Sequence, residues 1–473
     1  MGVGLFTMLA FQNCRPYNLP TDELSSSATE PIFALSTKHI DFGTRAVGTT
    51  SSEQIVIITN SGTSLLTFPS AFELVGDFSF GGVGTCQVGV SYSPGESCTA
   101  SVTFHPTSTG PKDGSLTISS ANPIQTQQVK LAGIGEAQPI MDCTSIVTTV
   151  SELVTAASSA VAGAVICVTP GTYNVGTLVS SVSGNATNRI MFFSQTKWAA
   201  KIVGSGTGAV WTNSGSYVDI VGFDMSGSGR LGLNNSGSFV SIRGNHVHNL
   251  KVSGGCTSSG GAGIVNSNYS ASDNEIVGNL VHDIGIPGAC LGVQGIYHSN
   301  LRGHIVNNIV YRASAWGIHL WHAANAVTIM NNTVFNNGTV SMGGGIVIGS
   351  GDSGGGVLDN SLIANNIVYA NPSYGLVEYC YSGQMCIGNN VVVSNNLVFA
   401  SQTRIKLVKG ADVATLQTDP LFINFQPDGS GDYHLSQSPR SPAIAYGIPS
   451  PSLTSDFEGK ARSLSQPSLG AYE

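Results

Sequence analysis

A short pattern of apolar and amide residues recurs along the second half of the chain. Each copy has Ile or Val three positions before an asparagine, Val two positions after it, and His, Tyr or Phe three positions after it. The asparagines, 24 to 34 residues apart, are Asn245, Asn279, Asn308, Asn332, Asn366 and Asn396. A constant pattern with spacers of variable length predicts one repeating structural unit joined by loops.

A second apolar run follows each copy of this pattern. These runs begin at Gly263, Gly295, Gly317, Gly345, Gly375 and Arg404. They are short, rich in Ile and Val, and bounded by Gly, Asn and Ser, and no helical period lies between them, so they predict strands between turns. Such repeats fit a β-solenoid, whose stacked coils bury a continuous core and align the asparagines in one column. Asn tolerates the left-handed bend of a tight corner, and stacked amides can bond along the column.

The asparagine column and the Gly-Ile strands resemble those of the right-handed parallel β-helix of the pectin-lyase-like proteins. The resemblance covers roughly residues 141–473, and it implies the fold rather than the chemistry. Residues 168–173, Val-Thr-Pro-Gly-Thr-Tyr, resemble the entry of many bacterial β-helices. Residues 151–162 contain no glycine and predict one short helix, which we expect to cover the open end of the solenoid.

The C-terminal residues also carry a recognisable signature. The runs at 418–422 and 469–473 resemble the closing segment of secreted bacterial β-helix proteins. The resemblance implies that this segment covers the last coil. We therefore interpret Asp419, Asp456 and Glu458 as structural rather than catalytic.

Residues 31–136 alternate apolar and polar positions, with turn signals at regular spacing, which predicts a β-sandwich. The runs Ile-Asp-Phe-Gly at 40–43, Thr-Asn-Ser-Gly at 59–62 and Phe-His-Pro at 104–106 resemble the immunoglobulin-like choice-of-anchor D module of bacterial surface proteins, related to the abnormal-spindle and hydin modules. The resemblance implies a spacer or a binding domain. The predicted fold class is therefore all-β, an immunoglobulin-like β-sandwich followed by a right-handed parallel β-helix.

Eight of the nine cysteines pair by proximity in the sequence and in the predicted solenoid. Close spacing pairs Cys86 with Cys98, Cys143 with Cys167 and Cys380 with Cys386, and equivalent loops of consecutive coils pair Cys256 with Cys290. Four disulfides would indicate an oxidising compartment. Buried free thiols are the alternative.

Cys14 is left over, and it follows an apolar run over residues 2–11. This arrangement resembles the end of a bacterial lipoprotein signal, in which the cysteine carries the lipid. No Lys or Arg precedes the apolar run, and Asn13 stands where a small residue is usual, so an ordinary signal peptide is the alternative. Residues 1–30 are thus predicted to be a signal or lipid-anchor segment with a linker, and the location to be extracytoplasmic, as a surface lipoprotein or a secreted protein.

Composition narrows the partners. Charged residues make up 10% of the chain and the net charge is −8, which gives no electrostatic reason to expect nucleic acid. A membrane contact is predicted only through the N-terminal lipid anchor. A polysaccharide or an envelope glycan is the expected partner.

Seven of the ten histidines lie between residues 246 and 322, where stacked coils lie about 4.8 Å apart. Strand alternation puts Val265, Tyr297, His319, Val347, Val377 and Lys406 in one outward column, and Trp321 in the next. The predicted catalytic residues are His319, Tyr297, His298 and Arg312. The predicted substrate-binding residues are Trp321, His322, His248, Lys251, His282 and Asp283.

These residue types suit β-elimination from a uronate, which needs a base, a cation that neutralises the carboxylate and an acid for the leaving oxygen. The alternative is that they decorate loop corners. A divalent cation such as calcium is a possible cofactor, with His282 and Asp283 as candidate ligands. The Asp-rich calcium site of pectate lyases is not evident. Of the polygalacturonase motifs only Arg-Ile-Lys at 404–406 is present, and paired acids for glycoside hydrolysis are lacking.

Two hypotheses follow. The first is a carbohydrate-active enzyme, a lyase-like β-helix acting on an acidic polysaccharide. The second is a non-catalytic surface protein that binds glycan, mediates adhesion or acts as a spacer. The cluster of His, Tyr and Trp favours the first hypothesis, and the missing family motifs favour the second.

Overall fold

The computed structural model describes residues 32–121, 124–136, 142–251, 260–285, 292–339, 343–349, 357–379 and 387–473. Cys14 and the predicted pairs Cys256–Cys290 and Cys380–Cys386 lie outside these residues. Among the described residues, no helix is long and apolar enough to cross a membrane.

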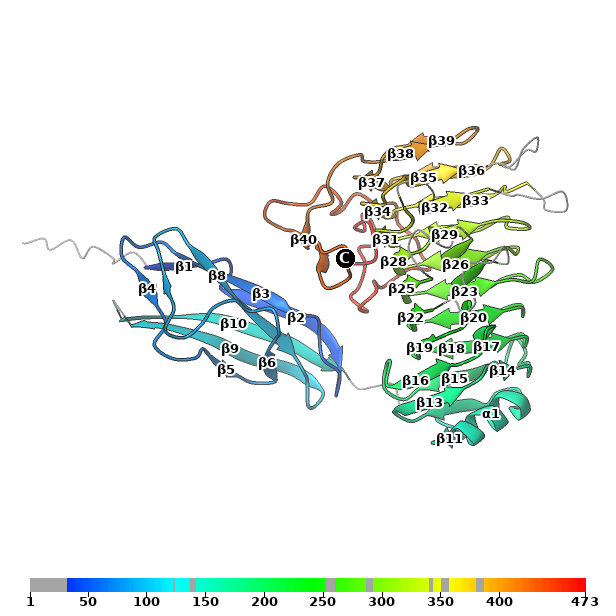
Figure 1. Ribbon diagram of the computed structural model, residues 1–473, viewed down its shortest axis with the longest axis horizontal. Coiled ribbons are helices and arrows are strands. Elements are labelled where there is room, and N and C mark those ends of the chain that lie inside the picture. The colour runs from blue at the N-terminus through cyan, green and yellow to red at the C-terminus, as the bar shows by residue number, and fades with distance from the viewer. Residues whose placement is uncertain are drawn as a thin grey trace, which may run out of the picture.

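The N-terminal part is a sandwich of two antiparallel-rich sheets (Figure 1). One sheet has the order β1 (Phe33–Leu35), β3 (Gln54–Asn60), β8 (Ser97–Phe104) and β6 (Phe78–Phe80). The other has the order β2 (His39–Ala46), β10 (Ile124–Glu136), β9 (Gly110–Ala121) and β5 (Glu73–Val75), and the short strands β4 (Leu66–Thr67) and β7 (Ser91–Tyr92) pair separately. Inward residues such as Phe33, Val56 and Leu116 are fully buried between the sheets. The predicted sandwich is confirmed, and so is the Cys86–Cys98 disulfide within it.

The C-terminal part is a right-handed parallel β-helix, as predicted (Figure 1). Each coil contributes one strand in turn to three parallel sheets of the described residues, which we call sheets 1, 2 and 3. Sheet 1 comprises β11 (Ser145–Val147), β12 (Val165–Val168), β15 (Ile190–Ser194), β18 (Val218–Val221), β21 (Ser241–Arg243), β24 (Glu275–Val277), β27 (His304–Val306), β30 (Thr328–Met330), β33 (Ser361–Ala364), β36 (Val391–Ser394) and β39 (Ala411–Val413).

The other two sheets complete the walls of the solenoid. Sheet 2 comprises β13 (Gly171–Val175), β16 (Ala200–Gly204), β19 (Asp224–Gly227), β22 (His246–Leu250), β25 (Leu280–Ile284), β28 (Ile309–Ala313), β31 (Thr333–Phe335), β34 (Ile367–Tyr369) and β37 (Leu397–Phe399). Sheet 3 comprises β14 (Leu178–Ser180), β17 (Ala209–Asn213), β20 (Leu231–Asn235), β23 (Gly261–Asn266), β26 (Val293–His298), β29 (Trp316–Leu320), β32 (Gly344–Ile348), β35 (Tyr374–Glu378) and β38 (Thr403–Lys406). Inward Ile, Val and Leu side chains of all three sheets form one continuous core.

The asparagine column is confirmed as a buried ladder between sheets 1 and 2. The side-chain amide of Asn245 donates to Asn279 Oδ1 at 3.1 Å, and that of Asn279 donates to Asn308 Oδ1 at 3.0 Å. The bonds continue through Asn332, Asn366 and Asn396. The left-handed residue of each corner is the one before the ladder asparagine, for example Gly244 at φ 64° and Asn307 at φ 57°, and not the ladder residue that we predicted. The ladder amides instead satisfy backbone groups inside the corner.

The predicted terminal helix is confirmed as α1 (Val150–Ser159). Thr149 and Glu152 form a capping box, in which each side chain bonds to the other residue's backbone N–H. Leu153 and Ala157 are fully buried and join the solenoid core, so the helix covers the first coil. The predicted Cys143–Cys167 disulfide lies at the same end.

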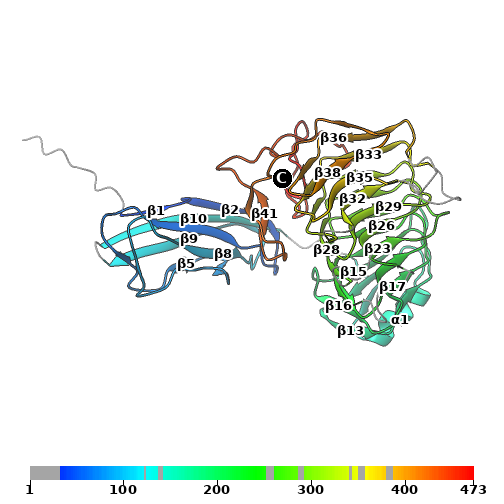
Figure 2. The same ribbon diagram turned by 45° about the horizontal axis from the view of Figure 1, so that its top comes forward.

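The C-terminal segment does not simply cover the last coil, which corrects our expectation. After β39, the last strand of sheet 1, the segment contains β40 (Phe422–Asn424) and β41 (Asp432–Leu435). It runs back along the outer face of sheet 2 (Figures 1 and 2). The reason is the outward aromatic column formed by the last residue of the repeated pattern. Its later members, Tyr311, Phe335 and Tyr369, present apolar surface, which the segment buries with Phe422, Phe425 and Tyr433.

The acidic residues of this segment are structural in their contacts, in line with the sequence interpretation. Asp419 accepts from Tyr369 Oη and Leu421 N. Asp456 accepts from backbone N–H groups of Glu458, Lys460 and Glu473. Glu458 pairs with His434 and with Arg45 of the sandwich at 3.5 and 3.4 Å, so it joins the segment to the N-terminal part.

Candidate functional site

The predicted outward column on sheet 3 is confirmed by the strand register. Val265 pairs with Tyr297, Tyr297 with His319, and His319 with Val347 on successive strands. The column continues through Val377 to Lys406. Two coils therefore bring Tyr297 and His319 side by side, as the alternation of the sequence predicts.

Aromatic rings surround this column and form what we call the aromatic row. Its members are Tyr269, Tyr297, Trp316, His319, Trp321, His322, Tyr374 and Tyr379. Tyr297 meets His319 edge to face with ring centroids 5.0 Å apart, and His319 meets Trp321 at 5.2 Å. Ring contacts thus link residues of several coils into one surface on sheet 3.

Glycines of strand β32 and its end allow the rings on either side to approach. Trp321 stacks on Tyr379, two coils away, with centroids 5.3 Å apart, and Gly349 lies between them in register. A Cβ on Gly349 would meet the backbone oxygen of Tyr379 at 2.2 Å. Trp316 and Tyr374 stack at 6.0 Å across Gly344 in the same way. The small residues therefore keep the aromatic row continuous.

His319 occupies the middle of the row, and its polar atoms are not satisfied. Both ring nitrogens are buried and have no hydrogen-bond partner among the described residues. Burial, with a smaller effect of nearby His322, lowers the pKa of His319 to about 3. The imidazole is therefore neutral at ordinary pH. Buried polar groups are nearly always bonded, so the two ring nitrogens of His319 are candidate partners for a ligand or a water.

His298 does not belong to this surface, which corrects its assignment as a catalytic candidate. It is fully buried, and its Nδ1 accepts from Asn266 Nδ2 at 3.0 Å while Nε2 donates to the carbonyl of Asn300 at 2.9 Å. It continues a second buried ladder formed by Asn213, Asn235 and Asn266. Burial lowers the pKa of His298 to about 4. The side chain points inward because it lies one position after Tyr297 on the same strand.

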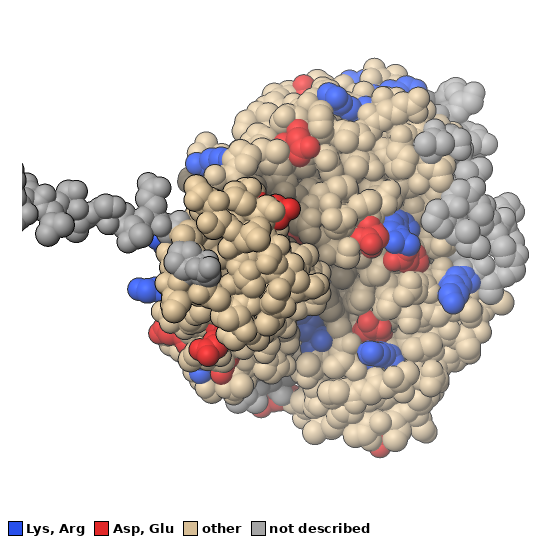
Figure 3. Space-filling view, turned by 60° about the vertical axis from the view of Figure 1, so that its left-hand side comes forward, with Lys and Arg blue, Asp and Glu red and all other residues tan. Residues whose placement is uncertain are grey.

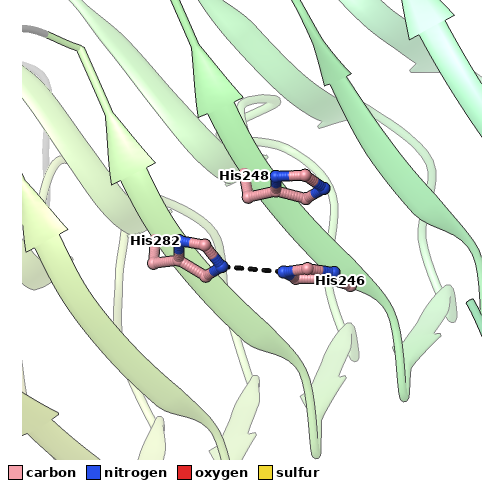
Figure 4. A group of neighbouring side chains, drawn as sticks. All are labelled: His246, His248 and His282. Atoms are coloured by element: carbon pink, nitrogen blue, oxygen red, sulfur yellow. Dashed lines mark hydrogen bonds between the residues drawn. The ribbon is translucent and has the colours of Figure 1, made fainter. Parts of the chain in front are cut away.

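A second group of chemically versatile side chains lies on the outer face of sheet 2. The histidine cluster, as we call it, consists of His246 and His248 on β22 and His282 on β25 (Figure 4). One ring nitrogen from each lies within 4.8 Å of the other two. The Nε2 atoms of His246 and His282 are 2.7 Å apart, and the rings of His246 and His248 stack at 3.9 Å.

Two carboxylates hold the cluster in place. Asp224, on the preceding strand β19, bonds to His246 Nδ1 and to His248 Nε2, both at 3.0 Å. Asp283 bonds to His282 Nδ1 at 2.6 Å. Although burial alone would raise the pKa of Asp224, its hydrogen bonds to the two histidines hold that pKa well below the ordinary range. Both carboxylates are thus ionised acceptors of imidazole N–H groups.

Arg312 lies with this second group. From the sequence we placed it beside His319, so that prediction was wrong. Its guanidinium pairs with Asp283 at 2.8 Å. Asp283 and Arg312 are equivalent positions of successive coils, and both have left-handed backbone, at φ 54°. That corner conformation is rare for residues other than glycine and turns both side chains out of the wall of the solenoid.

The remaining predicted binding residues divide between the two groups. His322 stacks on Tyr269 in the aromatic row, with centroids 4.3 Å apart. Lys251 is exposed and directly follows β22, the strand that carries His246 and His248. Our sequence reasoning missed Asp224 and His246 as site residues. The signal was available, because His246 and His248 alternate on one strand and Asp224 is one coil earlier.

Charged side chains are few on the face of the molecule drawn in Figure 3. Blue and red side chains stand singly or in small mixed groups over it. A hollow of about 740 Å³ on sheet 1 is lined by charged residues of both signs, among them Arg189, Asp219, Arg243 and Glu275. Asp219 already pairs there with Arg189 at 2.6 Å and with Arg243 at 3.4 Å.

No family model matches the chain. A curated relative, the uncharacterized protein YwoF of Bacillus subtilis (strain 168), is 36% identical over 108 residues, which are 21% of this chain. The chain spans about a fifth (21%) of the length of that relative.

Several solved structures resemble the chain in fold. Pectate lyase Pel9A is 16% identical, with 67% of this chain and 90% of that chain covered and a TM-score of 0.47. An alginate lyase from Paenibacillus sp. str. FPU-7 is 17% identical, with 56% and 98% covered and a TM-score of 0.38. The periplasmic alginate epimerase AlgG is 12% identical, with 61% and 84% covered and a TM-score of 0.34.

Proposed function

We propose that the protein is an extracytoplasmic polysaccharide-active β-helix protein that binds an acidic glycan along the aromatic row and cleaves it by β-elimination. The observation that carries the proposal is His319, whose two buried ring nitrogens have no hydrogen-bond partner among the described residues, in the middle of a continuous row of aromatic rings. A bound sugar would supply both the missing polar partner and the apolar faces that stack on the rings.

The row has the properties of a sugar-binding surface. Ring contacts arrange Trp321, Tyr379 and Tyr297 along the axis of the solenoid. An extended chain of sugars would lie in the same direction. Aromatic faces bury large apolar area at little cost in conformational entropy. Such a surface favours a polymer over a single sugar, because successive rings of the row can contact successive units.

The proposed step is removal of the proton next to the uronate carboxylate, followed by loss of the 4-linked oxygen. His319 takes the proton on a ring nitrogen, the C–O bond breaks as the double bond forms, and Tyr297 donates a proton to the leaving oxygen. Because burial lowers the pKa of His319, its imidazole is in the free-base form that a proton acceptor needs. An anionic substrate next to the ring would raise that pKa and strengthen the base, which favours uronates over neutral sugars.

A specific observation favours a second candidate function, glycan binding without cleavage. The cation expected to neutralise the uronate, Arg312, is paired with Asp283 on sheet 2. Without a neutralising group, the aromatic row would bind glycan and leave it intact. In this second function the sandwich, whose sequence resembles a choice-of-anchor D module, acts as a spacer.

The extracytoplasmic location is supported by the disulfides Cys86–Cys98 and Cys143–Cys167, since such bonds persist in oxidising compartments. Lipidation at Cys14 and the pairs Cys256–Cys290 and Cys380–Cys386 stay predictions.

The test is a screen of polymeric uronates, alginate and polygalacturonate among them, against the purified full chain. Formation of unsaturated ends is followed by ultraviolet absorbance, and binding is followed in parallel by affinity electrophoresis. New absorbance with wild type and none with His319→Ala supports cleavage. Retarded migration without new absorbance supports the binding function, and neither signal with any acidic polymer contradicts both.

A further inference from the structure

His246 and His282 of sheet 2 face each other with ring nitrogens that both lack a proton to donate. An ionised carboxylate can only accept, so Asp224 fixes the proton of His246 on Nδ1 and Asp283 fixes the proton of His282 on Nδ1. In a neutral imidazole the other nitrogen then carries a lone pair. The two Nε2 lone pairs face each other at 2.7 Å (Figure 4), where neither can donate to the other.

A positive centre between the rings would resolve this contact. One extra proton would give an imidazolium–imidazole hydrogen bond, and a metal ion would accept both lone pairs. The surroundings favour the ion. A third imidazole, that of His248, brings a nitrogen within 4.8 Å of the other two, and a proton shared by two rings makes no use of it.

The groups behind the histidines also match a metal site. Histidines that bind a metal commonly donate their other N–H to a carboxylate, which fixes the tautomer and makes the ligand more basic. His246 and His282 each have this partner, from different coils, at 3.0 and 2.6 Å. Arg312 pairs in turn with Asp283 at 2.8 Å, so the second carboxylate is itself held in place.

We propose that His246, His248 and His282 form a binding site for a divalent transition-metal ion of the zinc class, with Asp224 and Asp283 as its supporting carboxylates. The inference concerns sheet 2 and is independent of glycan binding at the aromatic row. Three imidazoles suit Zn²⁺ and its neighbours rather than Ca²⁺ or Mg²⁺, which prefer oxygen ligands.

Small movements complete the site. Zn–N bonds of about 2.0–2.1 Å place two nitrogens of a tetrahedral site roughly 3.3 Å apart, so the His246 and His282 rings separate by about half an ångström. His248 now bonds to Asp224 through Nε2 and to Asn249 through Nδ1, and it exchanges one of these bonds for the ion. The side chains of His246, His248 and His282 are 17%, 17% and 13% exposed, so a fourth position on the ion is open to water or to an oxygen ligand.

The experiment uses the full chain without a polyhistidine tag, stripped with chelator and titrated with Zn²⁺. We expect one Zn²⁺ per chain, and we expect Co²⁺ in its place to give visible absorbance typical of a four-coordinate site. Ca²⁺ and Mg²⁺ in excess should not displace the Zn²⁺. His246→Ala and His282→Ala should lose the ion, whereas His304→Ala, at an exposed histidine of sheet 1, should retain it.

Asp283→Asn separates metal binding from folding, because it leaves all three imidazoles in place. We expect its Zn²⁺ affinity to fall about 10–100-fold with an unchanged circular dichroism spectrum. Absence of stoichiometric Zn²⁺ binding by the wild type would overturn the proposal and leave the shared proton as the solution. Equal affinity in wild type and His246→Ala would also overturn it. Neither result bears on glycan cleavage, which is measured separately on the aromatic row.

Discussion

Tyr297 and His319 stand on adjacent strands in one outward column of sheet 3, with their rings edge to face and the centroids 5.0 Å apart. The imidazole has no hydrogen-bond partner among the described residues, and its ring contacts are with Tyr297, Trp316 and Trp321. This pair provides the sharpest test of cleavage, because its two members have different proposed roles.

His319→Ala should reduce the rate of uronate elimination about 10²–10⁴-fold, the usual contribution of a positioned base. Initial rates of ultraviolet absorbance at saturating polymer measure the effect. Lys406→Ala, three strands further along the same column, is the matched control and should stay within about twofold of wild type. A normal rate in His319→Ala with a loss in Lys406→Ala would place the chemistry elsewhere.

Trp321→Ala should weaken glycan binding more than it slows the bound reaction. The variant loses its stacking on Tyr379 and the face offered to a sugar, worth about 0.5–1.5 kcal/mol, or roughly a 2–13-fold rise in Kd. Affinity electrophoresis or calorimetry gives the Kd. Phe239→Ala removes a 37% exposed ring beside sheet 1, and it should leave the affinity unchanged. An equal loss in both variants would contradict a binding surface on sheet 3.

Asn308→Ala should destabilise the solenoid by at least about 2 kcal/mol. The Asn308 Oδ1 accepts from Asn279 N and Nδ2, and its Nδ2 donates to the carbonyl of Ile276 and to Asn332 Oδ1. All of these groups are buried, and each one left unpaired costs about 1–3 kcal/mol. Denaturant unfolding measures the loss. Asn188→Ala, at an exposed turn, is the control and should cost less than about 1 kcal/mol.

The contact between His434 and Glu458 should make stability depend on pH in two windows. Burial by itself would lower the pKa of His434, but hydrogen bonds to Asp432 and Glu458 raise it from 6.5 to about 10. Burial would raise the pKa of Glu458, but His434 and Arg45 lower it from 4.5 to about 2. The histidine therefore contributes fully below pH 6.5 and its contribution is lost as pH rises through about 10. The glutamate contributes fully above pH 4.5 and its contribution is lost as pH falls through about 2.

Thermal unfolding across these pH values tests the pair. The contribution of this pair to the stability of the wild type should be largest between pH 4.5 and 6.5. In His434→Gln, stability should change less with pH on both the acid and the alkaline side of this range. His105→Gln, at a half-buried histidine that directly follows β8 of the sandwich, is the comparison and should keep the wild-type profile. Identical profiles for wild type and His434→Gln would contradict the assigned pairing.

The sequence by itself determined the coils. The Ile or Val three positions before each ladder asparagine and the Val two positions after it are inward residues, so the period of these apolar residues predicted burial correctly. The same alternation placed Tyr297 and His319 in one outward column. A stacked parallel sheet allows this, because a residue's neighbour in space is the equivalent residue of the next repeat.

Only the tertiary structure decided which outward residues are accessible and how they group. The last residue of each repeat reads His248, His282, Tyr311, Phe335, Tyr369 and Phe399 along sheet 2. The C-terminal segment returns over the later, aromatic members, and the side chains of His248 and His282 stay 17% and 13% exposed. Nothing in the repeat predicts that return, since it depends on contacts between residues more than 90 positions apart. The corner conformation of Arg312, which sent its side chain to Asp283 rather than to His319, likewise depends on backbone geometry that strand alternation does not describe.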